Sequence, residues 1–269
     1  MTILDNDRIV EIERVNYCAM LASAAATPGL DVIVRDDVII STSEIFPTQD
    51  ANHACLLRTD AASADELIRE ITEQYHSRGL PAIIALSPAC TPADLNRRLI
   101  VSGFARHGPA EAWMTLNHVL NRVTPDPIGA VVVQRIGPGQ AEEFSRIFAE
   151  AFDLPAEYAP VMAQILEPTL ALPSVFHYLA TVDAEPVGTF SLLHCGSYGI
   201  IGSAGVLKRH RRSGAATNLT AQAVRKAQQL GIETLIQQTD AGRPLERLLR
   251  ITGFERVFTR DYYHLEPTG

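Results

Sequence analysis

The sequence predicts a mixed α/β fold made of two tandem copies of one unit, each copy a mixed twisted sheet flanked by helices. Short apolar runs alternate with stretches whose apolar residues recur at helical spacing. The order hairpin, strand, helix, strand, helix, Gly-Phe, strand occurs twice, and a shift of 150 residues places Gly103-Phe104 on Gly253-Phe254. The same shift places 82–86 on 232–236 without a gap. A repeat of domain length, with strands and helices mixed in this order, indicates tandem domains whose sheets are covered by helices.

The first copy is expected to open with a helix. Apolar residues between 7 and 26 recur at helical spacing, and Pro28-Gly29 is a stop signal. Two β-rich runs around a polar turn in 31–41 predict a hairpin. Ser63 and Glu66 form the pattern of a capping box at the start of a helix that runs to Arg78. The other elements expected in this copy are a strand within 52–58, a strand at 80–86, a helix from Thr91 to Val101 and a strand at 113–119.

A polar stretch with two prolines, 121–127, is expected to link the copies. In the second copy, Phe144, Ile147 and Phe148 stand at the core spacing of a helix over 138–152. The turn 183–185 between two β-rich runs predicts a second hairpin. The remaining elements expected are strands at 128–136, 200–206, 232–238 and 257–265, and helices at 158–166, 214–230 and 244–251.

Composition and charge narrow the class of protein. The 269 residues are 46% hydrophobic and 20% charged with a net charge of −8, whereas a nucleic-acid binder usually has a basic footprint. No apolar run reaches the ~18 residues of a membrane span, and acidic Met1–Asp7 lacks the basic and apolar regions of a signal peptide. Well-separated cysteines without a Cys-x-x-Cys pair favour free thiols in a reducing cytoplasm, with no disulfide or metal site. They are Cys18, Cys55, Cys90 and Cys195.

A cationic turn is the most informative stretch of the chain. The apolar run Ile200–Val206 reads as a buried strand, and Arg211–Ala216 then opens a long helical pattern. Amides freed at a helix start point at an anion, the helix dipole favours negative charge, and arginine adds a full charge. Small residues such as Gly214 let the backbone approach a ligand closely. The turn therefore predicts a site for a phosphate-bearing ligand.

The spacing Arg211-x-x-Gly214-x-Ala216 after Val206 resembles the acyl-CoA loop of GNAT-type acyltransferases, although Lys208 stands where that family has proline. The resemblance implies a GNAT fold and acetyl-CoA as co-substrate. It implies that turn amides hold the pyrophosphate, and that two strands splay apart and expose an amide near Val206 that polarises the thioester carbonyl. The residues it assigns to acyl-CoA are Val206, Lys208, Arg211, Arg212, Ser213, Gly214, Ala215, Ala216 and Thr217.

The first copy departs from this pattern. At the matching position it has Arg58–Glu66, without Arg-x-x-Gly-x-Ala and with three carboxylates that would repel phosphates. We therefore expect a degenerate GNAT-like domain over 1–120, a linker over 121–127 and an acyl-CoA-binding domain over 128–269. The first copy is interpreted as structural, or as a wall of the acceptor pocket.

The residues that would transfer protons are less distinct. The family often places a tyrosine in Leu-Tyr-x-x-x-Gly-Phe as the acid that protonates the thiolate, and Leu249 occupies that position here. Asp240, Tyr263 and Tyr158 are the substitutes selected from the regions that usually surround the thiol and the acceptor. Other candidates with no distinctive spacing are Tyr262, His264, His194, Cys195 and Glu157.

The expected function is N-acyl transfer from acetyl-CoA to the amine of a small molecule or peptide by direct attack. One alternative is a CoA-binding protein without transfer activity, which Leu249 favours. Another is acyl-thioester chemistry on a carrier protein. No metal, membrane or nucleic acid is expected as a partner, and the sequence leaves a homodimer open.

Overall fold

The structure is a computed structural model that describes residues 5–27, 29–124 and 126–267. Three groups of predictions fall partly outside these residues. They are residues 1–4 of the acidic start predicted at 1–7, the prolines at 28 and 125 that belong to the helix stop and the linker, and the last two residues of the second domain, 268–269.

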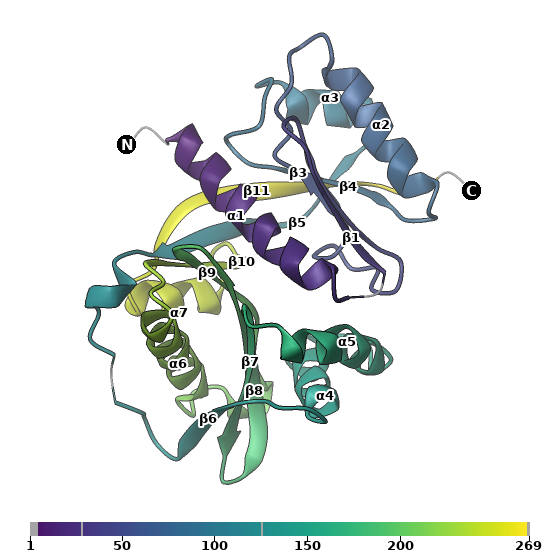
Figure 1. Ribbon diagram of the computed structural model, residues 1–269. Helices are drawn as coiled ribbons and strands as arrows, with labels where there is room; N and C mark the ends of the chain where they lie inside the picture. The colour runs from purple at the N-terminus through teal and green to yellow at the C-terminus, as the bar shows by residue number, and fades with distance from the viewer. Residues whose placement is uncertain (1–4, 28, 125, 268–269) are drawn as a thin grey trace.

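Within the described residues, the strands form one continuous sheet of eleven. Their order across the sheet is β1-β2-β3-β4-β11-β5-β10-β9-β8-β7-β6, so the two halves share a single sheet (Figure 1). The strands are β1 (Leu30–Val34), β2 (Ile39–Ser43), β3 (His53–Cys55), β4 (Ala82–Leu86), β5 (Ala105–Leu116), β6 (Val131–Arg135), β7 (Val175–Val182), β8 (Glu185–Cys195), β9 (Tyr198–Val206), β10 (Thr234–Asp240) and β11 (Glu255–Leu265).

Helices cover both faces of this sheet. Hydrophobic clusters place α1, α4 and α5 on one face, and α2, α3, α6 and α7 on the other. The helices are α1 (Asn6–Ala24), α2 (Ala64–His76), α3 (Leu95–Val101), α4 (Ala141–Ala151), α5 (Tyr158–Leu166), α6 (Ala215–Gln229) and α7 (Pro244–Ile251), with 3-10 turns η1 (Val119–Asn121), η2 (Glu167–Ala171) and η3 (Lys208–His210).

The last strand of each half is inserted into the other half. β11 pairs antiparallel with β4, and β5 pairs antiparallel with β10. The two exchanged strands also pair with each other, and they run side by side through the centre of the molecule (Figure 1). The sequence pattern predicted both strands but not this exchange.

The repeat seen in the sequence is also a repeat of geometry. Leu99 and Leu249 are both buried, and the amides of Phe104 and Phe254 donate to their carbonyls at 2.9 Å. Gly103 and Gly253 have φ of +91° and +94°, which favours glycine. Each Gly-Phe pair therefore ends a helix in the same way.

The capping box predicted at Ser63 and the helix start predicted at Thr91 are wrong, although α2 does begin directly after Ser63. The Ser63 side chain makes no capping hydrogen bond, because Asp60 Oδ1 accepts from the amides of Ala62 and Ser63, both at 2.8 Å. α3 begins at Leu95 rather than near Thr91, whose hydroxyl instead donates to the Thr59 carbonyl at 3.1 Å. In both cases the polar side chain competes for a local backbone partner that the helix pattern does not reveal.

Candidate active site

Strands β9 and β10 separate in the middle of the second half. Their parallel pairing ends at Ile201 and Gln237. Beyond this point β10 continues against β5 as far as Asp240, while β9 continues against β8 as far as Val206. Residues 202–206 are partly exposed although they belong to a sheet interior. The separation leaves a gap between two strands in which main-chain groups have no neighbouring strand.

Main-chain groups of Val206 point into this gap. The amide of Leu207 donates to the Val187 carbonyl at 2.9 Å, on the β8 side. Successive residues of a strand present their amide and carbonyl to opposite edges. The amide and carbonyl of Val206 are therefore directed away from β8 and toward the side where β10 has moved away.

The turn between β9 and α6 presents further free amides. Gly214 is the N-cap residue, with φ of 90°, and Arg212 also has a positive φ of 75°. In the part of the chain that the structure describes, the amides of Arg212, Gly214, Ala216 and Thr217 have no protein acceptor. The dipole of a fifteen-residue helix adds positive potential at this point. The amides of Ser213 and Ala215 differ, because they donate to the His210 carbonyl at 3.2 Å and to Ser213 Oγ at 3.3 Å.

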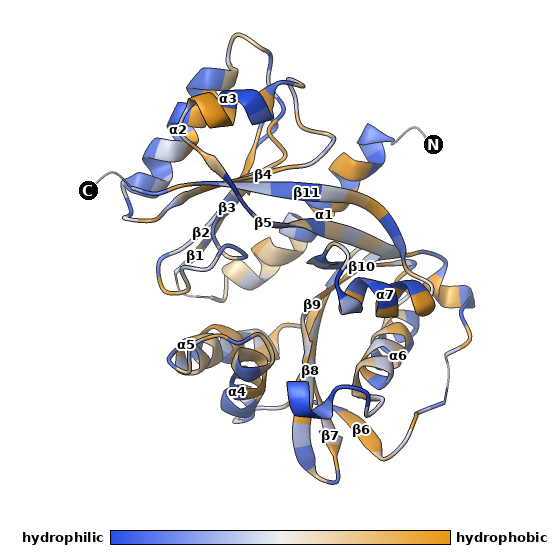
Figure 2. Cartoon of the chain, turned by 180° about the vertical axis from the view of Figure 1, so that it is seen from behind, coloured by the Kyte–Doolittle hydropathy of each residue, from blue (hydrophilic) through white to orange (hydrophobic). Residues whose placement is uncertain are grey.

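Basic side chains near this turn fall into two groups. Lys208 Nζ binds Asp153 Oδ1 at 2.7 Å, and Arg209 binds Glu150 and Glu185. Arg211 and Arg212 are exposed, and neither has an acidic partner within the described ranges. Figure 2 shows a strongly hydrophilic stretch of this turn near β8 and β6. Arg211 and Arg212 therefore keep their charge available, whereas that of Lys208 is compensated.

The turn is anchored by the end of the linker. Asn218, which is buried, donates to the Ile128 carbonyl and accepts from the Ile128 amide, both at 2.9 Å. A Cβ on Gly214 would lie 3.3 Å from Ile128 Cγ2. Since φ at this glycine is also positive, a side chain here would strain the turn. The shape of the turn thus depends on a contact between Asn218 and Ile128, which are 90 residues apart in sequence.

The matching region of the first half is filled by the protein itself. Beyond β3, the Thr91 amide donates to the Leu57 carbonyl at 2.8 Å, and its carbonyl accepts from Thr59 at 3.3 Å. This chain segment occupies the edge that is open beside Val206. Just before α2, the Asp60 carboxylate accepts hydrogen bonds from the amides of Ala62 and Ser63, and it places a negative charge near the start of that helix.

The sequence model of the Acetyltransferase (GNAT) family matches residues 141–254. The second half of this chain is therefore similar in sequence to the GNAT family. The match covers α4 to α7, including the separated strands and the amide turn. No curated protein matches the sequence.

Solved structures extend the likeness to the whole chain. A GCN5-related N-acetyltransferase from Kribbella flavida is 19% identical with a TM-score of 0.66, over 93% of this chain and 96% of that one. A tandem GNAT protein from the clavulanic acid biosynthesis pathway, solved without AcCoA, is 14% identical with a TM-score of 0.62, over 96% of each chain. At these identities the likeness shows the fold. The predicted fold class, a tandem GNAT architecture with a mixed sheet flanked by helices, is confirmed.

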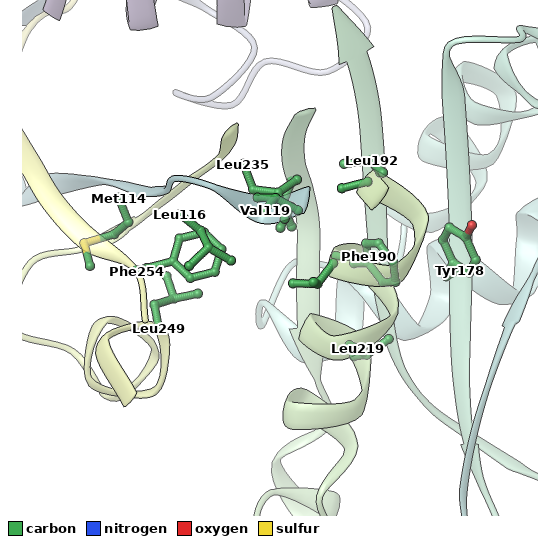
Figure 3. Packing of buried hydrophobic residues seen from close by; sticks show 14 of the residues in the cluster. Met114, Leu116, Val119, Tyr178, Phe190, Leu192, Leu219, Leu235, Leu249 and Phe254 are labelled. Atoms are coloured by element: carbon green, nitrogen blue, oxygen red, sulfur yellow. The ribbon is translucent and has the colours of Figure 1, made fainter. Parts of the chain in front are cut away.

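Leu249 is a core residue of the second half. It is fully buried and points at Phe254 and at Met114 of β5 (Figure 3). A tyrosine hydroxyl at this position would have to be accommodated in an apolar cluster. The proton donor that the family often supplies here is therefore replaced by packing against an exchanged strand.

A row of charged residues crosses the centre of the sheet on the α1 face. Asp240 of β10 is paired with Glu111 of β5, which is paired in turn with Arg260 of β11. Arg260 is buried, and its guanidinium holds Glu111 Oε2 at 2.8 Å and Glu13 Oε1 at 3.4 Å. Asp240 lies at the exposed end of this row, with its side chain 56% exposed. Further groups around the guanidinium are the hydroxyls of Tyr17 and Tyr262 and the ring of Trp113.

We expect Arg260→Met to lower the free energy of unfolding by about 3–5 kcal/mol, because it leaves the buried Glu13 carboxylate without its countercharge. Urea denaturation at neutral pH measures the change. The double variant Arg260→Met/Glu13→Gln should recover part of the loss. Equal stability of the single and double variants would contradict this assignment.

Asp50 is a candidate that the sequence pattern missed. Its loop between β2 and β3 is fixed by Asn52, whose Nδ2 donates to the carbonyls of Phe46 and Thr48 at 3.0 and 3.1 Å. Asp50 is exposed, yet desolvation by the surrounding protein, together with the charges of Glu111 and Asp240, raises its pKa to about 6. The charge of Arg260 opposes this rise. The sequence around Asp50 has no periodic pattern that sets this residue apart from other acids in polar loops. Only the fold shows that it lies near charged residues of both halves.

The other predicted proton-transfer residues are spread apart. Tyr158 is the first residue of α5. Its ring packs edge-on against the ring of Phe46 in the first half, with 5.3 Å between the ring centroids. It therefore lies where the two halves meet. Tyr263 is buried in the hydrophobic cluster under α2 and α3, on the opposite face of β11 from Arg260. The structure does not bring Tyr263 beside Asp240, and its role stays a prediction.

Two kinds of feature are absent from residues 5–27, 29–124 and 126–267. No helix there combines the length and hydrophobicity needed to cross a bilayer. Within the same residues, no group of three or more His, Cys, Asp or Glu side chains is placed to hold a metal ion.

Proposed function

We propose that this protein is an N-acyltransferase that moves an acetyl group from acetyl-CoA to an amine. The proposal rests on one observation in the second half: an exposed strand edge leads directly to a turn with free amides. A gap between β9 and β10 exposes the main chain of Val206. It leads to a turn in which, among the described residues, the amides of Arg212, Gly214, Ala216 and Thr217 have no protein acceptor. An extended pantetheine arm with a pyrophosphate at one end matches both features.

Donor binding follows from these groups. The amides of Gly214, Ala216 and Thr217 would receive the pyrophosphate oxygens, with Arg211 and Arg212 adding charge-assisted hydrogen bonds. The pantetheine amides would pair with the free edge of β9 around Val206. The thioester would then lie where the two strands meet, next to Ile201.

Direct transfer requires protons to leave the nitrogen and one to reach the sulfur. The acceptor must lose its ammonium proton before its nitrogen attacks the thioester carbon. As the C–S bond breaks, the attacking nitrogen loses a second proton to give the neutral amide, and the released thiolate takes up a proton. Asp50 suits the first step, because its pKa near 6 leaves it ionised at neutral pH and more basic than an ordinary aspartate. A free amide of β9 suits stabilisation of the carbonyl oxygen. With Leu249 in the core, the thiolate takes its proton from water or from another residue.

Charge removal at the turn tests donor binding. Arg211→Ala and Arg212→Ala are each expected to weaken CoA binding by about tenfold or more, because hydrogen bonds to charged groups are worth about 1.5–3 kcal/mol. Lys208→Ala is expected to cost less than about threefold, because that charge is already paired at the surface with Asp153. Isothermal titration with CoA measures all three. Equal losses for the three variants would contradict this division of roles.

One observation favours a second function, a CoA-binding protein without transfer activity. Leu249 replaces the usual proton donor and is buried. Thiol release from acetyl-CoA, measured with a panel of small amines and peptides, separates the two functions. Tight CoA binding with no release on any acceptor would reject transfer to amines, and release only with an acyl carrier protein would favour thioester exchange.

We further propose that the first half, within 1–120, does not bind CoA and serves as a wall of the acceptor site, with 121–127 as the linker. Its strand edge is occupied by Thr91, and the start of α2 by Asp60. A stoichiometry of one CoA per chain in the same titration supports this proposal, and two sites would overturn it.

A further inference from the structure

Strand β9 contains three glycines with different surroundings. A Cβ on Gly199 would lie 2.9 Å from Leu235 Cδ2, and one on Gly205 would lie 2.8 Å from Phe152 Cε2. A Cβ on Gly202 would meet no atom within 4 Å. Close packing explains the first two glycines. Gly202 instead borders open space in the interior of a sheet that has helices on both faces.

This space lies on the face of β9 that α1 and α4 cover. Ile201 belongs to the cluster under α6, so Gly202, the next residue, faces the opposite way. Its cross-strand partner is Ser191, whose hydroxyl bonds His177 Nδ1 at 2.7 Å. His177 in turn meets Phe144 of α4 edge-on. His177, Ser191 and Gly202 are therefore neighbours on the sheet face beneath α4, and Gly202 is the one whose position on that face borders open space.

Gly202 is also the first residue beyond the last pair of β9 with β10. On the proposed path of the donor, this is the thioester end. The α6 face at this point is filled by Ile201 and its cluster. An acceptor can therefore reach the thioester carbon from the α1 and α4 face, over Gly202.

Two polar side chains on the strands beside Gly202 already have partners. Ser191 is engaged by His177, and Gln238 of β10 donates to Asn16 of α1 at 2.9 Å. Because these side chains are already hydrogen-bonded, this face of the sheet has few free polar groups to bind a charged substituent. It suits carbon atoms attached to the acceptor nitrogen.

We propose that Gly202 is a specificity-determining residue whose missing side chain makes room for a substituent on the carbon next to the acceptor nitrogen. The proposal rests on the proposed transfer of an acetyl group to an amine. It predicts that the protein accepts amines branched at this carbon, and that a side chain at position 202 excludes them before it excludes unbranched amines.

Two isomeric probes test this inference: 1-phenylethylamine, which is branched next to nitrogen, and 2-phenylethylamine, which is not. Gly202→Val should lower kcat/KM for the branched amine at least tenfold and for its isomer less than threefold, with KM for acetyl-CoA unchanged. Gly202→Ala should fall between. Equal losses for both amines, no loss, or a loss that follows acyl chain length from acetyl- to butyryl-CoA would overturn the proposal.

Binding and stability keep the test independent of turnover. Titration of each amine into CoA-saturated protein should show the same selective loss in Gly202→Val, even if no acetyl group is transferred. Absence of transfer with this selectivity intact would reject the proposed function and leave the pocket assignment standing. Gly202→Ala should leave Tm unchanged or raised, whereas Gly205→Ala should lower it because Phe152 fills that site. A lowered Tm in Gly202→Ala would show that no open space exists there.

Discussion

Ala216→Glu is expected to abolish detectable CoA binding, with a loss of at least about a hundredfold, because placing like charges together in a binding site costs several kcal/mol. Ala216 lies in the first turn of α6, where its amide has no protein acceptor. A carboxylate there would occupy the place of the pyrophosphate. The same carboxylate interacts favourably with the helix dipole, so stability should be kept or raised by about 0.3–1 kcal/mol.

Opposite effects on binding and stability make this variant decisive. Titration with CoA measures binding and thermal unfolding measures stability. Gln229→Glu, an exposed change of equal charge at the far end of α6, serves as the matched control and should bind CoA normally. Normal CoA binding by Ala216→Glu would remove the α6 turn from the donor site.

Asp50→Asn is expected to lower kcat/KM for amine transfer by about 10²–10⁴-fold, the usual contribution of a general base. In the native protein, kcat/KM should rise with pH as Asp50 loses its proton near pH 6, and this rise should be absent in the variant. CoA affinity should not change, because Asp50 lies in the first half. Stopped assays of product at several pH values measure the profile.

The control for Asp50→Asn is Asp36→Asn, an exposed acid of the first half next to the turn between β1 and β2. It should leave both kcat/KM and the pH profile unchanged. An unaltered profile in Asp50→Asn would assign proton removal to another group, of which Asp240 is the next to test.

The raised pKa of Asp50 also has a consequence for stability. Its pKa in the folded state, about 6, lies above the ordinary value of 3.8, so the native state holds the proton more tightly than the unfolded chain. Ionisation therefore reduces stability progressively as pH rises from about 4 to above 6. Asp50→Asn should melt at a higher temperature than the native protein at pH 8 and at a similar temperature at pH 4.

Much of the geometry of the strand, turn and helix around the proposed donor site could be predicted from sequence, because its signals are local. The apolar strand ending at Val206, the small residues at 213–216 and the helix that follows are consecutive in the chain. Their geometry depends mainly on short-range backbone preferences. The agreement between the two Gly-Phe helix ends has the same origin.

The acceptor side could not be predicted, because it depends on contacts between distant segments. Residues 105–110 lie outside the strand predicted at 113–119 and are mostly exposed, yet they form the start of β5 because β11 supplies their hydrogen-bonding partners. Asp50, Glu111 and Arg260 come from a loop and two strands, and they meet only through the strand exchange. Compensation of Lys208 by Asp153 likewise required the fold to be known.

The strand exchange has a consequence for how the protein is made. On the ribosome, β4 emerges long before β11, so one edge of the first half stays unpaired while nearly the whole second half is synthesised. An exposed strand edge is a site for aggregation, and long-range pairing folds slowly. We expect the nascent first half to depend on chaperones until Leu265 has left the exit tunnel. We also expect a stop codon before β11 to destabilise the fold of the N-terminal half as well as that of the C-terminal half.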